Sequence, residues 1–186
     1  MPSKEIMPSA ENTSIKPGIA SNLHTTYLFK EKKARTAINE FAYLLEKGYE
    51  GLYITRTPPK KVKEQVKTGQ YTIIWLTGNK VPTQNTVAPT EISRLAASLL
   101  KFLCPPENVE DAEAANVQKR VLLIDNIEYL ILQNNFQIIV RLLHMVQDKI
   151  MLYPAIMLVP VDPLTFDPRE LRLIERECEV IDIKDY

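Results

Sequence analysis

The chain has 186 residues, of which 45% are hydrophobic and 25% are charged, enough apolar material for the core of one globular domain. Lysine plus arginine and aspartate plus glutamate each number 23, so no overall positive field draws the protein to nucleic acid or to an anionic membrane. The apolar runs fall far short of the roughly 20 residues that cross a bilayer, and the start of the chain lacks a signal-peptide segment. The sequence therefore predicts a cytoplasmic protein without membrane insertion.

The expected organisation is a flexible N-terminal arm over residues 1–22 followed by a single α/β domain over residues 23–186. The arm mixes proline, serine, asparagine and lysine without an apolar period. The expected elements of the first half are a strand at 25–29, a helix at about 32–47 that Gly48 ends in the left-handed conformation, a strand at 51–55, a basic segment at 58–67, a strand at 71–76 and a helix at 90–103 with Thr90 as N-cap.

The second half begins after Pro105 and Pro106 end that helix and a polar stretch at 107–118 follows. The expected elements are an apolar strand at 120–124, a short helical piece after Asp125, a helix at about 136–151 after a break at Asn134 and Asn135, a strand at 154–159, a helix capped by Asp167 that runs to about residue 177, and a strand at 179–183. Strands that are apolar throughout and alternate with helices predict a three-layer α/β/α fold with a mostly parallel sheet of about six strands.

Asp125 is placed where parallel-sheet proteins bind ligands, at the carboxyl end of a buried strand. With Glu128 it makes the pattern D-x-x-E at a strand-to-helix junction. This pattern predicts a capping box for the following helix, and a remnant of a metal site is the alternative. Asp162 and Asp167 stand beside prolines, which favours roles in turns and caps.

Metal and catalytic chemistry find little support elsewhere in the chain. Cys104 and Cys178 lie far apart, and neither has a second cysteine or a histidine at metal-ligand spacing. His24 and His144 are isolated, and no nucleophile arrangement accompanies them. We therefore expect no metal site, no cofactor and no catalytic residue of the common types.

Five segments in order carry a resemblance to known proteins: GLYITRTPP (51–59), IIWLT (73–77), VLLIDNIEYLI (121–131), VPVDP (159–163) and ELRLIERE (170–177). Together they resemble the largely archaeal family of unknown function numbered 835 (DUF835). More distantly, the chain resembles the RecA-like P-loop ATPases of the KaiC type. The resemblance implies a RecA-like, Rossmann-like domain in which residues 120–124 correspond to the Walker B strand.

The chain departs from those ATPases where they bind phosphate. Their first strand leads into a glycine-rich loop with a lysine and a serine or threonine. Here residues 30–36 read KEKKART, which contains no glycine and is about three residues shorter than the motif requires. Residues 55–59 also lack the catalytic glutamates of the KaiC type. The resemblance with a lost Walker A loop therefore argues against an enzyme, and implies a signalling, regulatory or scaffold module that acts through protein contacts.

Two other functions remain open at this point. One is a nucleotide-binding protein or hydrolase with an unconventional site at the carboxyl edge of the sheet. Its candidate residues are Asp125, Asp162, Arg56 and Thr77. The other is a DNA-binding regulator, which the balanced net charge disfavours.

Two surfaces are candidates for contacts with partners. A basic cluster, Arg56, Lys60, Lys61, Lys63 and Lys67, could bind an anion or an acidic partner, or could be a solvated turn. No aromatic residue interleaves its lysines as in a nucleic-acid stacking platform. The helix at 136–151 has a second apolar side, which predicts either burial by neighbouring helices or a contact with a protein partner, including a possible homodimer. The residues on that side are Ile138, Leu142, Met145 and Met151.

Overall fold

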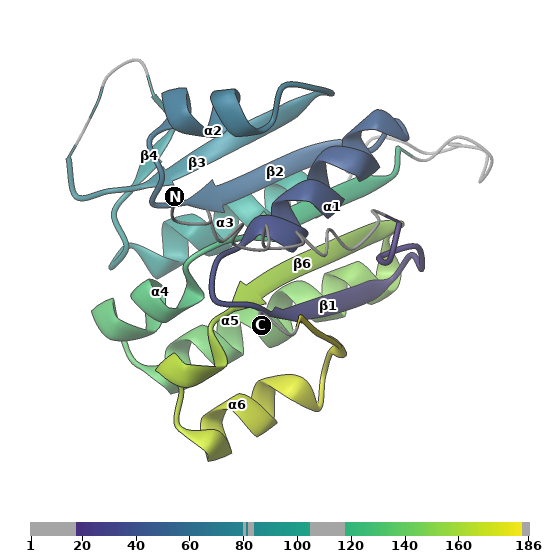
Figure 1. Ribbon diagram of the computed structural model, residues 1–186. Coiled ribbons are helices and arrows are strands. Elements are labelled where there is room, and N and C mark those ends of the chain that lie inside the picture. Colours follow the sequence, from purple (N-terminus) through teal and green to yellow (C-terminus); the bar gives the residue numbers. More distant parts are fainter. Residues whose placement is uncertain (1–17, 80, 82–83, 105–117, 184–186) are drawn as a thin grey trace, which may run out of the picture.

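Seven parallel strands form the central layer of the protein in a computed structural model that describes residues 18–79, 81, 84–104 and 118–183 (Figure 1). Their order across the sheet is β4-β3-β2-β5-β6-β1-β7, and every pair of neighbours is parallel. The strands are β1 (Thr25–Lys30), β2 (Glu50–Thr55), β3 (Tyr71–Leu76), β4 (Thr86–Val87), β5 (Arg120–Ile124), β6 (Ala155–Val161) and β7 (Glu179–Asp182).

Helices cover both faces of this sheet. The helices are α1 (Arg35–Glu46), α2 (Pro59–Gln65), α3 (Ile92–Leu103), α4 (Ile127–Gln133), α5 (Phe136–Leu152) and α6 (Pro168–Glu175), with a short 3₁₀ turn η1 (Pro163–Thr165) before α6. Helices α1 and α2 pack on one face, and α3, α4, α5 and α6 pack on the other (Figure 1). The predicted three-layer α/β/α fold is confirmed, and the described sheet is wholly parallel, with one strand more than expected.

The strand β5 shows why the sequence predicts this fold. Successive side chains of a strand point to opposite faces. Leu122 and Ile124 join the core under α3 to α6, whereas Val121 and Leu123 join the core under α1 and α2. Because both faces are covered, every position of the strand must be apolar.

Some local predictions differ from the structure. The segment 58–67 contains the helix α2, in which Val62 is buried, and the C-cap residue Val66 is buried one turn later. Helix α3 begins at Ile92 with Glu91 at the N-cap position, so Thr90 is not its cap. Strand β4 was missed because two residues carry no periodic signal. Pro105 and Pro106 and most of the polar stretch lie outside the described residues.

Gly48 ends helix α1 as predicted, with a φ of +88°, a value in the left-handed region that glycine adopts readily. Its place after the last turn lets the chain reverse directly into β2. Helix α5 likewise begins as predicted, because the side chain of Asn135 accepts a hydrogen bond from the Ile138 amide at 2.9 Å.

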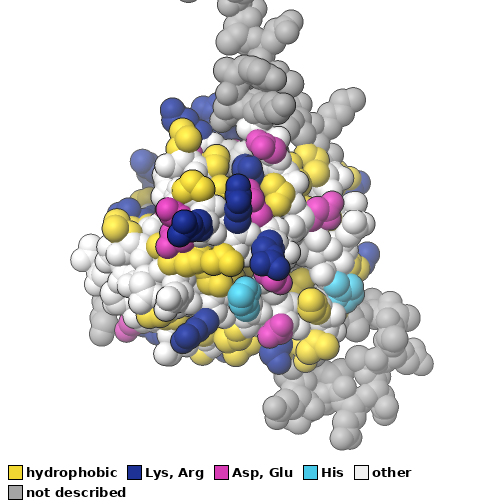
Figure 2. Space-filling model, turned by 90° about the horizontal axis from the view of Figure 1, so that it is seen from below, with side chains coloured by type: hydrophobic (Ala, Val, Ile, Leu, Met, Phe, Trp, Pro, Cys, Tyr) yellow, Lys and Arg dark blue, Asp and Glu magenta, His cyan; other side chains and the backbone are white. Residues whose placement is uncertain are grey.

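The apolar second side of α5 is only partly exposed. Leu142 is 5% exposed and belongs to the core, so its assignment to a partner-facing surface is corrected: the neighbouring helix α3 packs against α5. Met145 also packs against the core, whereas Ile138 and Met151 are 39% and 67% exposed. The possible homodimer stays a prediction. On the face drawn in Figure 2, hydrophobic side chains are interspersed with basic and acidic ones.

Residues 18–22 of the predicted arm are attached to helix α1. The carboxylate of Glu40, which is 1% exposed, accepts hydrogen bonds from the amides of Gly18 at 2.7 Å and Ala20 at 3.0 Å. Ala20 itself is fully buried. The rest of the arm, residues 1–17, lies outside the described residues. No helix in the described ranges has the length and apolarity needed to span a membrane.

Replacing Glu40 with alanine should release residues 18–22 from α1. The change leaves two amide donors without their acceptor, so we expect a loss of about 1–3 kcal/mol in the free energy of unfolding of this segment. Hydrogen exchange measured by NMR should show faster exchange at Gly18 and Ala20. The control is Glu46→Ala, which removes an exposed carboxylate from the same helix. Unchanged exchange at the two amides in the Glu40 variant would contradict this role.

Candidate functional site

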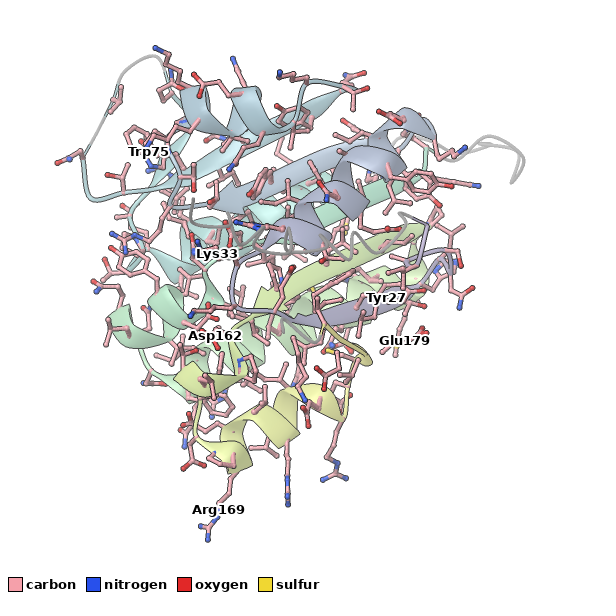
Figure 3. All side chains as sticks on the ribbon, in the orientation of Figure 1. Tyr27, Lys33, Trp75, Asp162, Arg169 and Glu179 are labelled. Atoms are coloured by element: carbon pink, nitrogen blue, oxygen red, sulfur yellow. The ribbon has the colours of Figure 1, made fainter. Side chains whose placement is uncertain are left out.

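A cavity of about 370 Å³ opens at the carboxyl edge of the sheet, where β1, β2, β5 and β6 end beside the start of α1. Two of its lining residues, Lys33 and Asp162, are labelled in Figure 3 and lie on the same side of the molecule. The chain leaves β1 and β2 towards the α1 and α2 face, but leaves β5 and β6 towards the opposite face. Open parallel sheets form ligand-binding crevices at such crossover points.

Glu31 occupies the start of helix α1 at this edge. Its side chain is buried, and its two carboxylate oxygens accept hydrogen bonds from the Thr36 amide at 2.8 Å and the Ala37 amide at 3.0 Å. Amides of the first helical turn have no partner within the helix, and they carry the positive end of the helix dipole. Glu31 thus supplies, from within the chain, the anion that this helix end attracts.

Glu31 was not singled out in the sequence. The signal that could have found it is the lack of a capping side chain at the helix start. Ala34 stands at the N-cap position and makes no side-chain cap bond. Because a helix end in a protein interior needs acceptors for its amides, a nearby acidic residue is then the expected substitute.

Asp125 lies at the base of the cavity and is 8% exposed. Its carboxylate accepts a hydrogen bond from the Thr55 hydroxyl at 3.0 Å and a longer one from the Tyr53 hydroxyl at 3.4 Å. Burial raises the pKa of Asp125, and the two hydroxyl donors oppose this rise in part. Burial and the neighbouring Asp125 also raise the pKa of Tyr53, so its hydroxyl keeps its proton and acts as a hydrogen-bond donor. The contacts join the end of β5 to the end of β2.

The predicted capping box between Asp125 and Glu128 is not formed. Asn126, in the left-handed conformation with φ +68°, is the N-cap residue of α4 and makes no side-chain cap bond. With this turn, Asp125 and Glu128 both line the cavity at the carboxyl edge of the sheet. Glu128 accepts a hydrogen bond from the Asp162 amide at 2.9 Å, which ties α4 to the end of β6. Burial raises the pKa of Glu128.

The two other acidic residues have the turn and cap roles that their prolines predicted. Asp162 accepts a hydrogen bond from the Leu164 amide at 3.0 Å and caps η1. Asp167 accepts one from the Arg169 amide at 2.8 Å and caps α6.

The four residues of the predicted unconventional site do not converge. Asp125 and Asp162 both line the cavity, but Arg56 and Thr77 are absent from its lining. The Arg56 guanidinium lies 3.7 Å from the centre of the Tyr129 ring, a cation–π contact. The Thr77 hydroxyl accepts a hydrogen bond from the Asn79 amide in the turn after β3. Strand order separates Thr77 from Asp125, because Thr77 follows β3 and β2 lies between β3 and β5.

Metal binding gains no support from the described part of the chain, where no group of three or more His, Cys, Asp or Glu side chains is placed to hold an ion. Cys104 and Cys178 are free thiols.

The rim of the cavity is basic, because the exposed residues Lys32, Lys33 and Arg35 line it. The site therefore combines hydrogen-bonded carboxylates inside with a positively charged entrance.

The predicted basic cluster is divided by the structure. Lys60, Lys61, Lys63 and Lys67 are exposed on α2 and the turn after it. Arg56 instead stacks on Tyr129 of α4. Of the predicted cluster, the four lysines therefore stay together on α2 and the turn after it, and Arg56 lies apart from them.

Fold and cavity define a Rossmann-like, three-layer α/β protein. The model of a family described as "Protein of unknown function (DUF835)" matches residues 30–178, and the chain belongs to this family. The comparison with curated proteins gave no match. Among solved structures, the protein studied as Project ID PH0250 from Pyrococcus horikoshii OT3 is similar, with a TM-score of 0.55 and 12% identity over 89% of this chain and 85% of that chain. At this identity the similarity concerns the fold alone.

Proposed function

We propose that the chain is a non-catalytic, RecA/KaiC-like module that acts as a signalling, regulatory or scaffold domain through protein contacts. The observation that carries the proposal is the pair of hydrogen bonds from the Thr36 and Ala37 amides to the carboxylate of Glu31. A nucleotide phosphate bound at the start of α1 would need these same donors. The phosphate-binding end of the helix is filled by the chain itself.

A phosphate would have to compete with a carboxylate that is covalently tethered beside its donors. Tethering gives such a group a high effective concentration, so that a ligand in solution is at a disadvantage. Glu31 also adds a negative charge to a cavity that holds the carboxylates of Asp125 and Glu128. The lysines and arginine of the rim attract anions, but they are exposed and salt screens their charge.

Asp125 supports the same proposal from the other side of the cavity. In an ATPase, an aspartate at the end of this strand would help to bind magnesium, as the RecA-like resemblance implies. Here the Thr55 and Tyr53 hydroxyls of β2 donate hydrogen bonds to its carboxylate, and burial raises its pKa. Asp125 therefore holds β5 to β2.

Calorimetric titration with magnesium and ATP tests the proposal. We expect no saturable heat at millimolar nucleotide for the native chain. Saturable binding that Asp125→Asn weakens, with the exposed control Asp148→Asn unchanged, would contradict the proposal and support the nucleotide-binding alternative. Binding to duplex DNA with a steep salt dependence would instead support the DNA-binding alternative.

A further inference from the structure

A second concavity, with a volume of about 660 Å³, lies between α2 and β3 and shares no lining residue with the cavity at the carboxyl edge. We refer to it as the α2–β3 groove. Its lining residues are Pro59, Lys63, Val66, Lys67, Gly69, Gln70, Tyr71, Ile73 and Gln84. In Figure 1, α2 lies beside β3 and β4 at one border of the sheet.

Hydrogen bonds and close packing hold the wall of the groove that joins α2 to β3. The Tyr71 hydroxyl donates a hydrogen bond to the Val66 carbonyl at 2.7 Å, and the Gln70 carbonyl accepts one from the Gly51 amide at 2.9 Å. Gly69 has a φ of +75°, and a Cβ at this position would lie 2.4 Å from the Cβ of Leu45. A groove whose walls are already ordered binds a ligand without the entropic cost of ordering them.

The floor of the groove is apolar and only partly covered. Tyr71 and Ile73 are alternate residues of β3, and both point to the face that α1 and α2 cover. Each remains partly exposed, because α2 has only seven residues and leaves this end of the strand uncovered. An aromatic or branched aliphatic side chain could bury itself against these two residues.

The charge at the groove has one sign. Among the described residues that line it, only Lys63 and Lys67 are charged, and both are exposed. Helix α2 also carries Lys60, Lys61 and Glu64, so its net charge is positive. An acidic ligand is attracted to such a surface and a basic one is repelled.

Strand β3 also has an unpaired edge beside the groove. In the part of the chain that the structure describes, β4 pairs with β3 only at Trp75 and Leu76. The first four residues of β3, 71–74, therefore have strand neighbours on the β2 side alone. An exposed edge of this kind can pair through its backbone with an extended segment of another chain.

We propose that the α2–β3 groove binds an extended acidic segment of a partner protein. The segment adds beside β3, places an apolar side chain over Tyr71 and Ile73, and sets its carboxylates against Lys63 and Lys67. This inference rests on the proposed function and names the kind of partner that a non-catalytic module would take. A nucleic acid fits the groove less well, since Tyr71 is the one aromatic residue in the described lining and successive bases would need several rings to stack on.

Selection from a display library of short random peptides tests the groove directly. The native chain should select peptides in which acidic residues flank an aromatic or branched aliphatic residue. The variant Lys63→Glu/Lys67→Glu should bind a synthetic copy of the selected sequence about tenfold more weakly or worse. The matched control is Lys60→Glu/Lys61→Glu, which changes the net charge equally at two positions of α2 outside the lining, and should retain most of the binding. Amide NMR signals of Tyr71, Ile73 and Gln84 should shift on binding.

Several outcomes would overturn the groove proposal. Selection of no peptide, selection of peptides without acidic residues, or equal binding by the two double variants would each do so. Tighter binding of a single-stranded or duplex oligonucleotide than of the selected peptide, at the same ionic strength, would assign the lysines to nucleic acid instead. None of these results bears on ATP binding, which tests the proposed function separately.

Discussion

Replacing Glu31 with alanine is expected to lower the free energy of unfolding by about 1–3 kcal/mol. The change removes the acceptor for the Thr36 and Ala37 amides at the start of α1. It also removes a negative charge from the positive end of the helix dipole. Urea denaturation should detect the loss. The control is Glu64→Ala, which removes an exposed carboxylate from α2.

The Glu31 variant should also acquire an anion dependence that the native chain lacks. Once the carboxylate is gone, the two amides can bind inorganic phosphate or sulfate, and binding to the folded state alone raises the melting temperature. Phosphate and sulfate stabilise many proteins nonspecifically, so the rise must exceed that of the native chain and of the Glu64 control at matched ionic strength. If Glu31→Ala is as stable as the native chain and its melting temperature shows no additional rise with anions, Glu31 is not an internal substitute for phosphate.

Thr55→Val should destabilise the protein by about 1.5–3 kcal/mol near neutral pH. It removes the closer donor to the buried carboxylate of Asp125 and the acceptor of the Thr57 amide. Of its two hydroxyl donors, Asp125 would keep the more distant one, Tyr53. Thr55→Ser keeps the hydroxyl and should stay close to the native stability, which separates the hydrogen bond from the loss of shape.

The loss in Thr55→Val should depend on pH. Because burial raises the pKa of Asp125 above its ordinary value of about 3.9, the folded protein holds this proton more tightly than the unfolded chain. The resulting stabilisation is complete below the ordinary pKa and disappears as the pH rises through the raised pKa of the folded state. Loss of the Thr55 donor raises that pKa further, so the deficit relative to the native chain should grow between pH 4 and pH 7. A deficit that does not change with pH would mean that the ionised carboxylate is not involved.

Much of the secondary structure could be predicted because its signals are local. The apolar run 120–124 predicted a strand buried on both faces, and Asp167 with Pro168 predicted the start of α6. Residues 58–67 were predicted only as a basic segment because four exposed lysines obscure the short spacing of Val62 and Val66. That error also hid the groove, whose one wall is this helix.

The sequence by itself determined the class of fold, the family and the position of Asp125 at the carboxyl edge of the sheet. The fold class and the family follow from local patterns of neighbouring residues. The position of Asp125 follows because it comes directly after a strand that is apolar throughout and must therefore be buried. Tertiary structure decided the contacts of the candidate sites. Asp125 meets Thr55, which is 70 residues away in the chain, only because β2 lies next to β5. Leu142 is buried in the core that α5 shares with α3 and the sheet, a packing that the helix's own sequence does not show. The sequence of residues 30–36 showed that the glycine loop is absent. It did not show that the Glu31 carboxylate accepts hydrogen bonds from the amides at the start of α1, because this contact depends on the path of the folded turn.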